Sequence, residues 1–250
     1  MVQAPRRAAL GGPTLVRLLA RLADADVPES RQPLSDRLSQ WLGWTDAIAL
    51  SAALNGNPPA VASSARGAAM EDDPAKRCAH VRSALTKAIV GDNASASARR
   101  DGRAPTRGQE APTDAQADFA VFRQRYLALQ QTMDTEIGAL RTRLRTMLAA
   151  RPHGMARLAM VDAVMERALS AREQSLFTAV PAWLAGHFQR LRQAEEERLA
   201  LAAGAEVVPT TVTPGAWLDV FRKDMQSVLL AELEVRFKPV EGLLAALRTR

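Results

Sequence analysis

Residues 119–148 decide the fold, and they read FAVFRQRYLALQQTMDTEIGALRTRLRTML. Apolar side chains recur in steps of three and four, at positions 119, 122, 126, 129, 133, 137, 140, 144 and 147. This spacing places them on one face of an α-helix. An eleven-residue step between Tyr126 and Ile137 relaxes left-handed supercoiling, so the helix is expected to be fairly straight. At about 1.5 Å per residue, a helix of about 34 residues spans roughly 50 Å, which is more than a compact domain requires.

Two further long helical patterns follow this segment. The turn Arg151-Pro152-His153-Gly154 separates the first pattern from the second, and Gly204 ends the second. Pro181 is expected to kink or interrupt the second helix, and Pro239 to begin a short terminal helix after the third. Three long helices with short connections predict an antiparallel, coiled-coil-like bundle over residues 113–250.

The N-terminal half carries shorter helical patterns. Residues 1–54 predict a helical hairpin, which Trp41 and Trp44 are expected to anchor. Residues 55–112 predict linker regions with one helix at about 73–90, whose apolar stripe is Cys78, Val81, Leu85 and Ile89. The stretch 91–112 contains almost no large apolar residue, so it is expected to be disordered.

The composition supports an all-α fold. Of the 250 residues, 47% are apolar but only 4% are aromatic, and Ala, Leu and Arg dominate over the residues that favour strands. We therefore expect an N-terminal helical hairpin plus a long antiparallel helix bundle, joined by disordered linkers. The single cysteine, Cys78, excludes an intramolecular disulfide framework and a cysteine-cluster metal site.

No motif of a known reaction is present. The chain lacks HExxH, GxSxG, P-loop and GxGxxG patterns and contains three histidines. Cys78 and His80 are two residues apart and so do not share a helix face. We expect a protein that is not an enzyme, with no cofactor and no metal. No run of roughly 20 apolar residues occurs, so we expect a cytoplasmic protein without membrane insertion.

The net charge of +6 and the pI of about 10.3 raise the question of whether the protein binds nucleic acid. Only four of the 33 basic residues are lysines, and Arg with Ala in such excess is typical of a GC-rich genome. Five arginines and no acid lie between Ala139 and Val161. The arginines Arg141, Arg145, Arg151 and Arg157 form a candidate anion or nucleic-acid patch. Alternatively, they complement the C-terminal end of the preceding helix.

The favoured hypothesis is a non-enzymatic interaction or assembly protein, because long helices with apolar stripes suit assembly. A protein partner or self-association is expected. The candidate stripe for packing or interaction consists of Phe122, Tyr126, Leu129, Met133, Leu140 and Leu144. Nucleic-acid binding through the basic turn at 141–157 is the alternative.

Residues 15–54 also carry a resemblance: LVRLLARLADADVPESRQPLSDRLSQWLGWTDAIALSAAL. This segment, with 119–148 and 214–237, resembles the uncharacterised proteobacterial family called domain-of-unknown-function family 3348. The quoted motifs are structural, and no catalytic residue is carried over. Members of that family are often encoded beside proteins like the MotA/TolQ/ExbB proton channels and OmpA-like peptidoglycan binders. The resemblance therefore implies a cytoplasmic accessory of an envelope proton-channel-like complex.

Overall fold

The computed structural model describes residues 14–25, 32–56, 73–101, 118–151, 153–204 and 215–249. All regular structure in these ranges is helical, which confirms the predicted all-α class. The helices of the described residues are α1 (Thr14–Ala23), α2 (Leu34–Trp41), α3 (Trp44–Asn55), α5 (Pro74–Asp101), α6 (Phe119–Ala149), α7 (His153–Gly204) and α8 (Ala216–Arg248).

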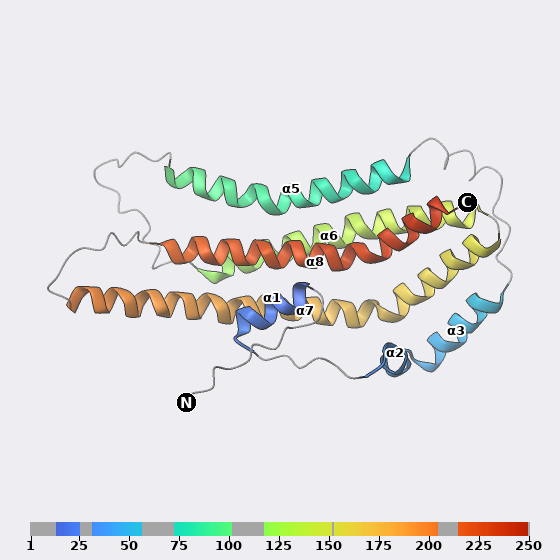
Figure 1. Ribbon diagram of the computed structural model, residues 1–250, viewed down its shortest axis with the longest axis horizontal. Helices are drawn as coiled ribbons and strands as arrows, with labels where there is room; N and C mark the ends of the chain where they lie inside the picture. The colour runs from blue at the N-terminus through green and yellow to red at the C-terminus, as the bar shows by residue number, and fades with distance from the viewer. Residues whose placement is uncertain are drawn as a thin grey trace, which may run out of the picture.

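The long helices pack side by side as an elongated bundle (Figure 1). α6, α7 and α8 all contact one another, and α5 packs on α6 and α8. α6 and α8 run in the same direction, whereas α5 and α7 run in the opposite direction (Figure 1). The predicted long antiparallel bundle is therefore confirmed.

The heptad-like face of α6 forms the centre of this bundle. Tyr126, Met133, Leu140 and Leu144 are buried, and Phe122 and Leu129 are partly buried against the same core. The helix begins at Phe119 because the Asp118 carboxylate accepts a hydrogen bond of 2.8 Å from the backbone N–H of Ala120. The stripe thus packs inside the bundle and leaves no surface for a partner there.

An aromatic cluster closes the end of the bundle where α6 and α8 begin. Phe188 of α7 is buried between Phe119, Phe122, Trp217 and Phe221, with ring centroids 5.0–5.8 Å from its own. Such tilted and edge-on contacts are the favoured geometries for aromatic pairs. Five of the eleven aromatic residues of the chain therefore lie where these three helices meet.

Both internal prolines lie inside continuous helices. α7 runs unbroken past Pro181, and α8 runs unbroken past Pro239. The expected interruption at Pro181 does not occur, whereas a kink there stays a prediction, and the expected separate terminal helix from Pro239 is wrong. Apolar side chains that flank each proline are buried in the bundle, and this packing outweighs the loss of one helical hydrogen bond there.

α5 is longer than its sequence pattern predicts. Cys78, Leu85 and Ile89 are buried as expected, but the helix continues past residue 90 and ends at Asp101. The backbone of residues 91–101, predicted to be disordered, is therefore helical. Alanines at 94, 96 and 98 favour helix strongly enough to carry it past Gly91. The predicted linkers at 57–72 and 102–112 lie outside the described residues.

The short N-terminal helices lie along the bundle. α3 packs against α7, and α1 packs against α7 and α8. Arg190 of α7 donates a hydrogen bond to the backbone carbonyl of Leu22, and Arg21 lies 3.6 Å from the carboxylate of Asp224. This arrangement differs from a hairpin packed on itself. The expectation that Trp44 anchors the N-terminal helices is wrong, because its side chain is 83% exposed.

Candidate functional site

A buried polar centre joins α6, α7 and α8. Glu232 is completely buried, and its carboxylate accepts hydrogen bonds from three side chains. The Tyr126 hydroxyl donates over 2.6 Å, the Gln130 amide over 2.9 and 3.1 Å, and the Arg236 Nε over 2.8 Å. A buried carboxylate is tolerated only with such partners, because burial without them costs several kcal/mol.

Pro181 explains why Gln130 belongs to this centre. A proline has no N–H, so it cannot donate to the carbonyl four residues earlier, which is that of Phe177. The Gln130 amide donates to this Phe177 carbonyl over 3.1 Å. The guanidinium of Arg236 lies 4.0 Å from the centroid of the Phe177 ring. The polar centre thus replaces the hydrogen bond that Pro181 removes from α7.

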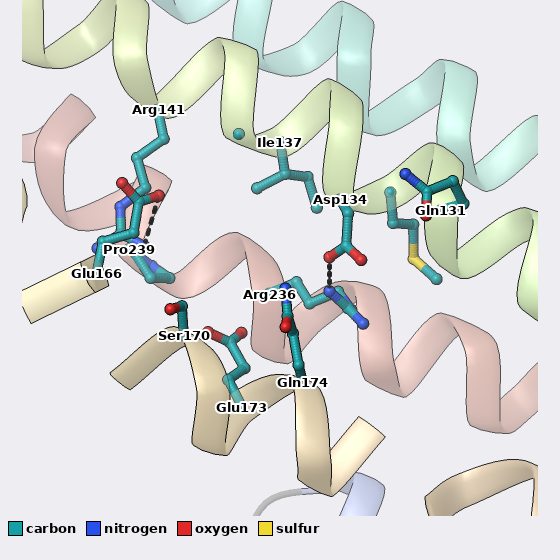
Figure 2. A pocket seen from close by; sticks show the side chains of 12 residues that line it. Gln131, Asp134, Ile137, Arg141, Glu166, Ser170, Glu173, Gln174, Arg236 and Pro239 are labelled. Atoms are coloured by element: carbon teal, nitrogen blue, oxygen red, sulfur yellow. Dashed lines mark hydrogen bonds and ion pairs between the residues drawn. The ribbon is translucent and has the colours of Figure 1, made fainter. Parts of the chain in front are cut away.

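A cavity of about 300 Å³ shares Arg236 with this centre (Figure 2). Arg236 forms an ion pair with Asp134 on one side of the cavity, and Arg141 lies 3.4 Å from Glu166 on the other. Ser170, Glu173 and Gln174 of α7 complete the wall. Both cations of the cavity wall are therefore held by carboxylates of neighbouring helices.

The chemistry of the polar centre is structural. Burial and the negative charge of Glu232 raise the pKa of Tyr126 far above its ordinary value, so the phenol stays protonated and donates its hydrogen bond. Within the described ranges, no group of three or more histidine, cysteine, aspartate or glutamate side chains is placed to hold a metal ion. The arrangement fixes the relative register of three helices.

Two of the predicted patch arginines, Arg141 and Arg145, form ion pairs with carboxylates of α7. Arg141 binds both carboxylate oxygens of Asp162 over 2.9 and 2.7 Å, and Arg145 contacts the same carboxylate over 3.2 Å. Arg145 also pairs with Glu166. The Arg141, Arg145 and Asp162 side chains are each no more than 16% exposed. They therefore connect α6 to α7.

The other two patch arginines lie apart from this cluster. Arg151 is exposed in the turn after α6, and Arg157 is exposed on α7. The structure thus brings together Arg141 and Arg145 but places both among acids that follow the basic run in sequence. Nucleic-acid binding at this turn stays a prediction.

An apolar groove of about 640 Å³ lies along a neighbouring face of α7, and Glu173 lines both the groove and the cavity. One wall is α1, and the other is the stretch of α7 from Leu169 to Trp183, with Trp41 at one end. Leu176 and Trp183 are 64% and 48% exposed. The guanidinium of Arg172 lies 4.6 Å from the ring centroid of Trp41. We call this surface the α1/α7 groove.

A second apolar surface adjoins the groove. The outer face of α3 presents a row of exposed side chains that lines a shallow hollow, with Trp44 and Ile48 as its large members. We call this row the α3 stripe: Trp44, Ala47, Ile48, Ser51, Ala52 and Asn55. The opposite face of α3 buries Ala53. Among the residues that the structure describes, large apolar side chains are therefore exposed on both surfaces.

Sequence reasoning missed the polar centre and both apolar surfaces. A proline in a helix leaves the carbonyl four residues before it without its helical hydrogen bond. This rule applied to Pro181 would have identified the Phe177 carbonyl as a group that needs another donor. Asp162 follows the basic run immediately, and Glu166 lies one helical turn later, which signals pairing across the turn. Nothing in the sequence identifies Gln130 as the partner, because that contact joins residues 47 positions apart.

Comparison with known proteins identifies the family of the chain. The model of the family described as protein of unknown function (DUF3348) matches residues 1–249, so the chain belongs to this family. The expected membership is confirmed over the whole chain. No curated protein and no solved structure matches it. Among the described helices, none has the length and apolar composition needed to cross a membrane.

Proposed function

We propose that the protein is a non-enzymatic helical interaction and assembly protein that binds protein surfaces through the side of α7 facing α1 and α3. The observation that carries this proposal is the α1/α7 groove, where the side chains of Leu176 and Trp183 are 64% and 48% exposed in an apolar hollow. Exposed apolar surfaces of this kind are typical of sites for protein association.

The polar centre and the groove have different roles in this proposal. The centre around Glu232 and the Arg141–Asp162 pair hold α6, α7 and α8 in one register. A rigid register keeps the wall from Leu169 to Trp183 in a fixed shape. This surface then loses less conformational entropy on binding a partner than a mobile surface would.

The proposed location is the cytoplasm, and the proposed context is an accessory role in an envelope proton-channel-like system of the MotA/TolQ/ExbB and OmpA-like type. The support for this context is the resemblance of the chain to a family whose members are encoded beside such proteins. This support is gene neighbourhood, and it defines which partners to test first.

The test is co-purification of the tagged full chain after cross-linking in its native host. The wild type is compared with a Leu176→Glu, Trp183→Glu double variant, which places two charges in the groove. Partner proteins are expected with the wild type and are expected to fall at least tenfold with the variant. A wild-type chain that is strictly monomeric and captures no protein would refute the proposal.

A further inference from the structure

The α1/α7 groove has the size and the lining of a site for a small apolar ligand. Its volume of about 640 Å³ lies within the range of about 300–1,000 Å³ that ligand pockets have. The lining residues that are buried or half-buried form its floor and come from α1, α7 and α8: Leu15, Phe177, Val180 and Val235. Leu176 and Trp183 form an exposed apolar rim, so an apolar ligand in the groove removes both from water.

The apolar side chains of the α7 wall form a row that begins at Arg172. Leu176, Val180 and Trp183 follow Arg172 after four, eight and eleven residues, which places them on one face of the helix. Eleven residues at about 1.5 Å each span roughly 16 Å. An extended alkyl chain advances about 1.3 Å per carbon, because its C–C bonds of about 1.5 Å zigzag, so a chain of about twelve carbons matches this row.

Arg172 supplies a positive charge at the start of the row. Its guanidinium lies over the Trp41 ring, 4.6 Å from the ring centroid. A guanidinium held over a ring by its face keeps the N–H groups in its plane available as donors. The described residues give Arg172 this ring contact and no ion pair. Arg172 is therefore placed to pair with an acid that enters the groove.

The other charged residue of the groove, Glu173, also lines the polar cavity. Figure 2 shows its side chain projecting from α7 into that cavity beside Ser170, on the side where Arg141 and Arg236 line it. The carboxylate thus faces the cations of the cavity. Arg172 therefore determines the charge that a ligand in the groove meets.

We propose that the α1/α7 groove binds a free fatty acid of about twelve carbons, with its carboxylate on Arg172 and its chain along the row to Trp183. A guanidinium binds a carboxylate through two parallel N–H···O hydrogen bonds, so one arginine matches one head group. This inference goes beyond the proposed function, because it assigns a small ligand to the groove. Since the ligand and a protein partner use the same wall, each is expected to exclude the other.

The charge of the groove favours a free ligand over a membrane surface. Binding to anionic bilayers uses clusters of about four to eight basic residues. Among the described lining residues, Arg172 is the one cation. One cation beside one apolar row matches a ligand with one head group and one chain.

The first measurement is isothermal titration calorimetry of the full chain with octanoate, decanoate and dodecanoate, each below its micelle concentration. A fully buried methylene contributes about fourfold in affinity, and a groove open on one side buries part of each methylene. The affinity is therefore expected to rise by about two- to fourfold with each methylene added. Absence of binding by dodecanoate, or an affinity independent of chain length, overturns the inference.

Arg172→Gln tests the head group. This variant is expected to bind decanoate at least about fivefold more weakly than the wild type does, whereas its affinity for the neutral alcohol decanol is expected to stay unchanged. The matched control is Arg167→Gln, which removes the same charge at an exposed arginine of α7 outside the groove. An equal loss in both variants means that the net charge, and not the contact at Arg172, controls binding, and it refutes the assigned site.

Tryptophan fluorescence tests the direction of the chain. The probe is undecanoate with bromine on its terminal carbon, because bromine quenches the fluorescence of a tryptophan that it contacts. Quenching is expected in the wild type and in Trp44→Phe, whose exposed ring lies outside the groove, and is expected to be lost in Trp183→Phe. Quenching that persists in Trp183→Phe contradicts the proposed orientation.

Leu176→Glu places a negative charge in the path of the chain and is expected to abolish binding of dodecanoate. Leu201→Glu, at an exposed leucine of α7 outside the groove, is expected to leave it unchanged. Vesicles of phosphatidylglycerol and phosphatidylcholine are expected not to sediment the wild type. Sedimentation that Leu176→Glu abolishes assigns the groove to a membrane surface and overturns the free ligand.

The inference and the proposed function fail separately. If no fatty acid binds but the partners found by co-purification depend on Leu176 and Trp183, the inference is wrong and the proposed function stands. All of the substituted side chains are exposed, so circular dichroism is expected to show unchanged helix content in each variant.

Discussion

Replacing Gln130 with leucine tests the link between Pro181 and the polar centre. The substitution keeps the side-chain size but removes the amide that donates to the Phe177 carbonyl and to Glu232. An unsatisfied buried carbonyl costs about 1–3 kcal/mol, and a lost hydrogen bond to a charged group costs about 1.5–3 kcal/mol. We expect the free energy of unfolding to fall by about 4 kcal/mol.

Part of this loss depends on the proline. Pro181→Ala restores an N–H that donates to the Phe177 carbonyl within α7. In the Pro181→Ala background, Gln130→Leu is therefore expected to cost about 1–3 kcal/mol less than in the wild type. The loss of the bond to Glu232 remains in both backgrounds.

The assay is urea unfolding of the four members of this double-mutant cycle, followed by circular dichroism. Gln131→Leu, at the exposed neighbouring position, is the control and is expected to change the free energy by less than about 0.5 kcal/mol. Equal costs of Gln130→Leu in both backgrounds, within about 0.5 kcal/mol, would show that Gln130 does not replace the missing helical bond.

Three further predictions follow from buried groups. Because the pKa of Tyr126, the single tyrosine, is raised by burial and by Glu232, its contribution to stability is complete below about pH 10 and is lost as the pH rises further. Urea unfolding at about pH 9 and 11 is expected to show this decline in the wild type but not in Tyr126→Phe. Asp162→Asn removes the carboxylate shared by Arg141 and Arg145 and is expected to lower the free energy of unfolding by about 2 kcal/mol, measured in urea; an unchanged midpoint would contradict the ion-pair role. Burial raises the pKa of the Cys78 thiol, so its reaction with a disulfide reagent is expected to be slow in the folded chain and fast in concentrated denaturant, and equal rates would refute its burial.

The long helices could be predicted from the sequence because their evidence is local. The spacing of apolar residues in α6 places Tyr126, Met133 and Leu144 on one face, and burial of that face follows from solvent exclusion. The Asp118 cap and the stripe of Cys78, Leu85 and Ile89 are equally local features. Each involves residues a few positions apart, so a single helix suffices to interpret them.

The two prolines show where local reasoning is insufficient. Taken alone, Pro181 and Pro239 predict an interruption, because each removes a hydrogen bond from its helix. The outcome depends on what packs around each proline, and at Pro181 Gln130 of a neighbouring helix satisfies the freed carbonyl. The basic run is similar, because Asp162 of α7 determines the electrostatic environment of Arg141 and Arg145.

The sequence by itself determined the class of fold, the extent of α6 and its buried face, because periodicity and capping act within one helix. Only the tertiary structure decided which charges are paired and which apolar residues stay uncovered. Trp41 and Trp44 illustrate the difference, since both lie in amphipathic segments three residues apart, yet one lies against Arg172 and the other is exposed to solvent. Exposure of a side chain depends on which helices lie against it, and that arrangement is fixed by contacts between distant parts of the chain.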